Sequence, residues 1–224
     1  MPVFVLMAGF GAFGKIAALG DFVRIHTPKG FASSWDDWLQ SAMLNSKDRM
    51  KAGWDTTYLS APLWRFSLPA GQAGSAPVIG VWMPSIDRVG RQFPLTLVAA
   101  HSSSNLPYLH FSNRAMFETL EAIALDTLQN ETPKTDLEAA LSEIDLDISC
   151  ASAFDGQAYA GDIAPEIALA AQALGQPDKA IWSCDLGNVH RLLRCNGLPT
   201  MAEFAMLLDP MSPDWPQIPV ESTA

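Results

Sequence analysis

Apolar and polar positions near the N-terminus predict a stretch of extended chain. Residues 3–16 are mostly apolar, and Gly9, Gly11 and Gly14 interrupt the run. This pattern indicates one strand, or two strands joined by a tight turn. A bend is expected at Asp21, which follows a glycine.

A helical pattern begins after that region. Ser33 or Ser34 is a suitable N-cap, and Asp36 and Asp37 are expected in the first turn, where the helix dipole favours carboxylates. Apolar residues then recur at a spacing of three or four, which predicts a buried stripe on one helix. The stripe comprises Trp35, Trp38, Leu39, Ala42 and Met43.

The rest of the chain adds strands first and mostly helices afterwards. Short runs rich in Val, Ile, Phe, Leu and Trp, bounded by Pro or Gly, are predicted strands: 63–68, 78–83 and 93–100. Two further runs predict a hairpin: 181–184 and 189–195. Helices are predicted at 55–61, within 108–129, and at 136–144, 163–174 and 200–208, the last capped by Thr200.

This order defines the expected fold class. Strands and helices do not alternate as they do in a parallel α/β protein, so a mixed, largely antiparallel sheet is expected, with helices on both faces. We expect a single α/β domain at residues 1–209, followed by a Pro-rich C-terminal tail at 210–224.

Composition is consistent with a large core and a reducing compartment. The 224 residues are 49% apolar and include seven Trp and eleven Phe, so no metal or disulfide is needed for stability. Three cysteines form no CxxC pair, and neither a signal peptide nor a run of about 20 apolar residues is evident. The sequence therefore predicts a cytoplasmic protein without membrane insertion.

Charge argues against some partners. The net charge is −10, with nine Lys and Arg against six Asp and Glu in residues 1–101, and five against eighteen in 102–224. An acidic chain repels phosphate backbones, so nucleic acid and anionic membranes are not expected partners. The acidic half is either a solvated face or a surface for a basic partner.

The segment from Gly9 to Lys15 satisfies both G-x-G-x-x-G and G-x-x-x-x-G-K. Both patterns bind phosphate when a helix follows them. Ile16 stands where a phosphate loop needs Ser or Thr, and Gly20 and Pro28 leave little room for a helix. A nucleotide- or anion-binding enzyme using this segment is the alternative function.

Other catalytic chemistry is sparse in the sequence. The four histidines and three cysteines show no metal-ligand spacing, and no G-x-S-x-G is present. We therefore predict no catalytic residue, no metal and no cofactor.

The densest polar group is Asp87, Arg88 and Arg91, between two predicted strands. An Asp among arginines can form ion pairs within a turn, while exposed Arg can bind carboxylate or phosphate. Both readings stay open. Arg65, within a predicted core strand, and Asp21, at a bend, are further candidates for a protein-binding surface.

Several blocks of sequence resemble one family. They are G-F-G-A-F-G-K-I-A-A-L-G-D-F-V-R (9–24), W-D-D-W-L-Q (35–40), A-P-L-W-R-F (61–66), M-P-S-I-D-R-V-G-R-Q-F-P-L (83–95) and C-N-G-L-P (195–199). In this order they are similar to the TagF family of type VI secretion-associated proteins. Ala17 and Leu19 depart from the family's usual proline and basic residue.

The resemblance implies a three-layer α-β-α sandwich and a regulatory role. It implies post-translational repression of bacterial type VI secretion, without catalysis, by binding the fork-head-associated scaffold protein of that system. The candidate binding residues are then Asp21, Arg65, Asp87, Arg88 and Arg91. A structural subunit of the secretion apparatus is a further alternative.

Overall fold

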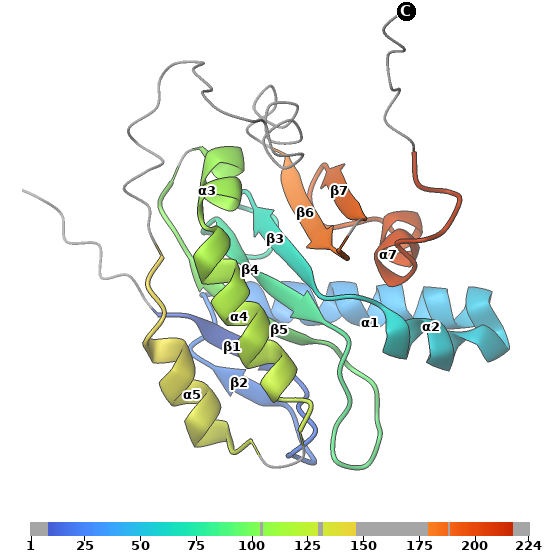
Figure 1. Ribbon diagram of the computed structural model, residues 1–224, viewed down its shortest axis with the longest axis horizontal. Coiled ribbons are helices and arrows are strands. Elements are labelled where there is room, and N and C mark those ends of the chain that lie inside the picture. The colour runs from blue at the N-terminus through green and yellow to red at the C-terminus, as the bar shows by residue number, and fades with distance from the viewer. Residues whose placement is uncertain (1–8, 104, 130–131, 147–178, 188, 217–224) are drawn as a thin grey trace, which may run out of the picture.

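A seven-stranded open sheet forms the centre of the protein in the computed structural model, which describes residues 9–103, 105–129, 132–146, 179–187 and 189–216 (Figure 1). The strand order is β2-β1-β5-β4-β3-β6-β7. The strands are β1 (Gly11–Gly14), β2 (Val23–Ile25), β3 (Trp64–Leu68), β4 (Val78–Met83), β5 (Leu95–Ala100), β6 (Ala180–Asp185) and β7 (His190–Cys195). Every described pairing is antiparallel.

The central strands are buried on both faces. All six residues of β4 and the first five of β5 are buried, which explains their nearly continuous apolar sequence. Trp64 lies opposite Trp82 and Arg65 opposite Val81, so neighbouring residues along β3 point to different faces. The two faces therefore carry separate cores.

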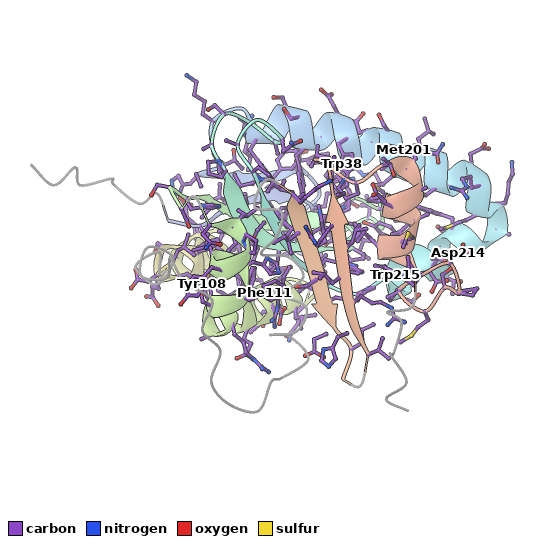
Figure 2. The ribbon with its side chains drawn as sticks, turned by 90° about the horizontal axis from the view of Figure 1, so that it is seen from above. Trp38, Tyr108, Phe111, Met201, Asp214 and Trp215 are labelled. Atoms are coloured by element: carbon purple, nitrogen blue, oxygen red, sulfur yellow. The ribbon has the colours of Figure 1, made fainter. Side chains whose placement is uncertain are left out.

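An aromatic core fills one face, beneath α1 (Phe31–Met50), α2 (Trp54–Ser60) and α7 (Met201–Leu208). Trp35 and Trp182 stack with ring centroids 5.9 Å apart, and Trp38 meets Phe204 edge-on at 5.6 Å. Figure 2 shows Trp38 close to where α7 lies beside α1. These contacts confirm the predicted aromatic stripe of the first helix.

An aliphatic core fills the other face, beneath α3 (Leu106–Ser112), α4 (Arg114–Asp126) and α5 (Lys134–Ser142). With helices on both faces, the predicted three-layer α-β-α sandwich is confirmed (Figure 1). None of the described helices is long and apolar enough to cross a bilayer.

Local differences from the predicted elements have physical reasons. The first helix starts at Phe31, because Phe31 is buried and stacks on Trp35, so the predicted serine caps were wrong. Its N-cap is Gly30, and Asp36 and Asp37 lie beyond the first turn.

Two further differences concern α3, α4 and β2. Asn113 divides the predicted 108–129 helix into two, and its side chain donates to the Leu109 carbonyl at 2.9 Å. The strand β2 was not predicted, because only three residues pair with β1. The predicted helix at 163–174 lies outside the described residues.

The C-terminal elements agree better with their sequence signals. Thr200 and Glu203 form a capping box at the start of α7, which confirms the predicted cap. Beyond it, Trp215 stacks on Trp64 with centroids 5.8 Å apart, and the Arg191 Nε donates to the Pro210 carbonyl at 2.7 Å. The described start of the tail therefore packs against the sandwich, while the boundary at 209 and 210 stays a prediction.

Candidate functional site

The loop between β4 and β5 holds three of the predicted site residues. Asp87 is 1% exposed, whereas Arg88 and Arg91 are exposed. The loop closes tightly, since the Asp87 amide donates to the Arg91 carbonyl at 3.1 Å and Gly90 adopts a φ of 83°. Only glycine adopts that left-handed conformation readily, so Gly90 fixes the turn.

Asp87 is the buried centre of a cluster of charges. Its Oδ1 accepts hydrogen bonds from the amides of Val89 and Arg91, at 3.1 and 2.8 Å. Its Oδ2 accepts from the Arg91 Nε at 2.6 Å and lies 3.0 Å from the Lys15 Nζ. Burial raises the pKa of Asp87, but these donors together hold it well below its ordinary value. We call Lys15, Asp87 and Arg91 the ion-pair cluster.

Lys15 follows β1 and is only 7% exposed. Its ammonium lies 5.3 Å from the centre of the Phe22 ring, besides pairing with Asp87. The glycine-rich segment before it is strand β1, paired on both sides. A Cβ on Gly14 would collide with the Pro94 carbonyl, so that glycine permits close packing of the chain. This segment does not have the geometry of a phosphate loop.

The loop after β1 is bound to the loop after β4. The Arg91 Nη2 donates to the Gly20 carbonyl at 2.5 Å, and the Arg88 amide donates to the Leu19 carbonyl at 2.9 Å. Asp21 lies beside this contact, is exposed, and accepts from the Phe22 amide at 2.7 Å.

Exposed side chains of the two loops form one surface, which we call the two-loop surface. It consists of Asp21, Phe22, Arg88, Val89 and Arg91. Val89 and Phe22 are 69% and 45% exposed, so apolar and charged groups alternate there. The structure therefore brings together Asp21, Arg88 and Arg91 on the surface and places Asp87 beneath them.

Arg65 does not belong to this surface. It projects from β3 toward α4, where its Nε and Nη2 donate to the two carboxylate oxygens of Glu121 at 2.5 and 3.0 Å. Its guanidinium also lies 5.4 Å from the centre of the Phe117 ring. Arg65 is therefore held in a bidentate pair between sheet and helix.

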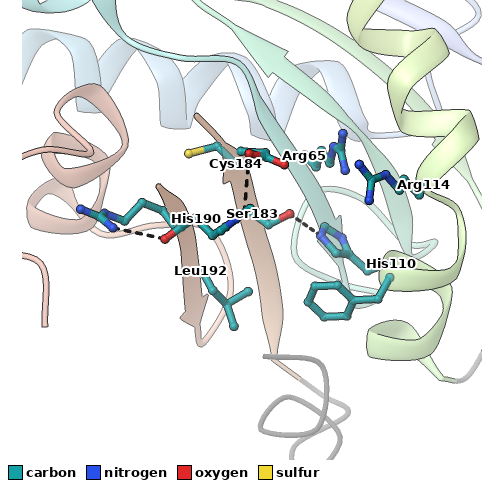
Figure 3. A pocket seen from close by; sticks show the side chains of 10 residues that line it. Arg65, His110, Arg114, Ser183, Cys184, His190 and Leu192 are labelled. Carbon is teal, nitrogen blue, oxygen red and sulfur yellow. Dashed lines mark hydrogen bonds and ion pairs between the residues drawn. The ribbon is translucent and has the colours of Figure 1, made fainter. Parts of the chain in front are cut away.

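Arg65 lines a small cavity of about 60 Å³ together with His110 and Ser183 (Figure 3). The His110 ring lies between the hydroxyls of Ser67 and Ser183, with both distances 2.8 Å. Burial lowers the pKa of His110 to about 3, and the Arg65 charge adds to the shift. The neutral imidazole therefore acts as a hydrogen-bonding bridge between two strands.

Cysteines and metal ligands add no reactive group in the part of the chain that the structure describes. Burial raises the pKa of Cys184 to about 12 and that of Cys195 to about 12, so both thiols stay protonated. No cluster of three or more His, Cys, Asp or Glu positioned to hold a metal occurs among the described residues.

Sequence reasoning missed two supports of the loop. The Tyr58 hydroxyl donates to the Ser85 carbonyl at 2.9 Å and accepts from the Ser85 amide at 3.1 Å. Gln92 accepts from the Trp54 Nε1 at 2.5 Å. Both partners come from α2, which no local sequence signal connects to this loop.

Comparison with known proteins places the chain in a family. The fold and the loops define a three-layer α/β protein with one fixed, charged and partly apolar surface. Residues 11–144 match the TagF N-terminal domain, described as type VI secretion system-associated, and the chain belongs to that family. No match was found among curated proteins.

A solved structure extends the likeness beyond the matched domain. The crystal structure of PA0076 from Pseudomonas aeruginosa PAO1, at 2.05 Å resolution, is 34% identical, with a TM-score of 0.77. The alignment covers 94% of this chain and 98% of PA0076. The sandwich as a whole, including its C-terminal strands and helix, is therefore shared.

Proposed function

We propose that this chain is a non-enzymatic, post-translational repressor of a bacterial type VI secretion system. It acts in the cytoplasm by binding the fork-head-associated scaffold protein and holding it away from the secretion machine. Membership of a type VI secretion-associated family supports a role in such a secretion system. The observation that carries the proposal is the two-loop surface, where ion pairs to the buried Asp87 fix two loops and leave Arg88 and Val89 exposed.

Three titratable groups, Asp87, His101 and His110, are poorly suited to act as a general base. Asp87 already has four donors, and burial lowers the pKa of His110 to about 3 and that of His101 to about 4. A general base needs a pKa near the working pH and access to substrate, which these groups lack.

Repression by binding requires only moderate affinity. A repressor in excess lowers the free scaffold tenfold when its concentration exceeds Kd by about tenfold. A Kd on the order of 1 μM, or about −8 kcal/mol, is sufficient when about 10 μM of the repressor is free. A surface with a few exposed apolar and arginine side chains is of the kind that supplies such affinity.

An affinity pull-down of the tagged chain from its own cells tests the proposal. We expect the scaffold to be recovered in near-equal amount, and deletion of the gene to raise secretion. Recovery of the assembled apparatus would support a structural subunit instead. Recovery of neither, with secretion unchanged on deletion, would refute the proposal.

Arg88→Glu tests the surface itself. Among the described residues Arg88 has no side-chain partner, so the variant should fold normally, keep its melting temperature, and lose at least tenfold in scaffold affinity. Lys29→Glu, an exposed charge reversal before α1, is the matched control and should bind within twofold of the unaltered chain. Equal affinities for Arg88→Glu and the control would mean that this surface does not dock the scaffold.

The enzyme alternative is tested by a thermal-shift screen with nucleotides and magnesium. Ligand at about a thousandfold excess over Kd adds roughly 4 kcal/mol and raises the melting temperature by several degrees. Because Lys15 is already paired with Asp87, we expect no shift.

A further inference from the structure

An open groove of about 790 Å³ lies next to the two-loop surface. One wall is the outer side of α1, with Leu44 and Lys47, and the other is the loop that contains Arg91. Trp54 and Phe93, both buried, form the base. The groove therefore combines an apolar base with charged rims.

The groove is formed in advance of binding. Gln92 accepts from the Trp54 Nε1 at 2.5 Å and donates from its Nε2 to the Asp55 Oδ1 at 2.9 Å, which fixes the loop against the start of α2. Leu44 is 72% exposed on the rim, although a leucine is stabilised by burial. A fixed wall lowers the entropy lost when a partner binds.

The charges in and beside the groove indicate which kind of partner it binds. Lys47 has no ionic partner among the described residues. The same is true of Arg88, which lies on the loop between β4 and β5. Lys15 and Arg91 share the single carboxylate of Asp87, so the ion-pair cluster keeps one net positive charge. The only acidic residue that lines the groove in the described structure is Asp55. The groove and the two-loop surface together hold four basic side chains (Lys15, Lys47, Arg88 and Arg91) and three acidic ones (Asp21, Asp55 and Asp87). The region therefore carries one net positive charge on a chain whose net charge is −10.

We infer that the groove docks an acidic, amphipathic segment of the partner protein. Apolar side chains of that segment cover Leu44 and the base, while its carboxylates pair with Lys47, Arg88 and Arg91. This arrangement is the helix-in-groove form of recognition, in which apolar anchors recur every three or four residues. The identity of the partner rests on the proposed function. The acidic, amphipathic character of the bound segment rests on the groove.

Leu44→Asp and Lys47→Glu test the groove with the purified scaffold. Both side chains are exposed, so both variants should keep the melting temperature of the unaltered chain. We expect at least a hundredfold loss of affinity for Leu44→Asp, about tenfold for Lys47→Glu, and weaker binding with rising salt. Leu125→Asp, at a position 53% exposed on α4 in the opposite layer, should bind within twofold. Equal affinities for the Leu44→Asp and Leu125→Asp variants would overturn the inference.

A pair of synthetic peptides separates this inference from the proposed function. The probe is an 18-residue helical peptide with Leu at every third or fourth position and Glu between, compared with the same peptide carrying Lys. We expect the Glu peptide to bind at least tenfold more tightly and to protect residues 40–47 from hydrogen exchange. Equal binding of both peptides, or none, overturns the inference. If the Glu peptide binds more tightly than the Lys peptide but the scaffold does not bind, the inference about the groove stands and only the scaffold is excluded as the partner.

Self-association is the remaining outcome of the test. Residues 102–224 carry thirteen more acidic than basic side chains, counting eighteen against five, and a second copy could present them. Sedimentation of the purified chain should show a monomer whose mass is unaffected by Leu44→Asp. A dimer that this substitution dissociates would show that a second copy fills the groove, and would overturn the inference.

Discussion

Lys15→Met gives the clearest test of the ion-pair cluster. Methionine keeps the length and apolar stem of lysine but removes the ammonium, which is the group that lies 3.0 Å from the Asp87 carboxylate. The Lys15 side chain is 8% exposed, so water does not replace the lost partner fully. The substitution therefore removes the buried ionic contact with Asp87, together with the contact between the ammonium and the Phe22 ring.

The expected loss of stability depends on the hydrogen-bond donors that still bind Asp87 in the variant. Removing one partner of a buried ion pair usually costs about 3–5 kcal/mol. We expect about 2–3 kcal/mol for Lys15→Met, because Arg91 and two backbone amides still neutralise and bind the carboxylate. In a domain of this size 1 kcal/mol corresponds to roughly 2–4 °C, so the melting temperature should fall by roughly 4–12 °C.

The pH dependence supplies a second, independent measure. Because the folded pKa of Asp87 is below its ordinary value, the ion-pair cluster stabilises the fold above that ordinary value and loses its effect as pH falls toward the folded pKa. The difference in unfolding free energy between the unaltered chain and Lys15→Met should be constant from pH 5 to 8 and shrink below pH 4. Urea denaturation at each pH measures it.

Two outcomes would refute this reasoning. Unchanged stability in Lys15→Met at pH 7 would mean that Lys15 contributes no structural ion pair and is free for a ligand. A difference that grows below pH 4 would mean that the carboxylate is not the partner. Lys29→Met, which removes an exposed ammonium near α1, is the matched control and should change stability by less than about 0.5 kcal/mol.

Two further substitutions test the close packing of β1 at Gly14 and the buried, neutral state of His110. Gly14→Ala should lower the unfolding free energy by about 2 kcal/mol or more, measured by urea denaturation, because Gly14 has a φ of 133° and a Cβ would meet the Pro94 carbonyl. His110→Asn should reduce the decline in stability between pH 7 and pH 5. The folded pKa of His110 is about 3, so unfolding takes up a proton below about 6.5 in the unaltered chain. An equal decline in both proteins would contradict the buried, neutral state of His110.

Strong local patterns predicted much of the fold. The apolar stripe containing Trp35 and Trp38 and the Thr200 cap were identified because each signal lies within one or two helical turns. Signals that depend on tertiary contacts were missed. Gly30 starts α1 because Phe31 is buried in the aromatic core, and no local pattern distinguishes it from the serines that follow.

The site was predicted in part for a similar reason. Asp87 and Arg91 are four residues apart, so their pairing within a turn was one of two readings of the sequence, and the structure contains it. The sequence suggested a role for Lys15 only in the alternative function, as part of a phosphate loop. Its actual partner, Asp87, lies in the loop between β4 and β5, far away in the sequence. Arg65 was grouped with the other arginines, yet Glu121 on α4 holds it away from the two-loop surface.

Two of the sequence blocks that resemble the family, 9–24 and 83–95, meet in space through the contact between Lys15 and Asp87. Lys15 belongs to one block, while Asp87 and Arg91 belong to the other, and the Asp87 carboxylate pairs with both basic side chains, which leaves one net positive charge. Arg88 has no side-chain partner among the described residues, and Val89 is 69% exposed beside it. Since exposure of an arginine and a valine at the tip of a tightly bound loop does nothing for folding, these two side chains are where selection for binding is expected to act.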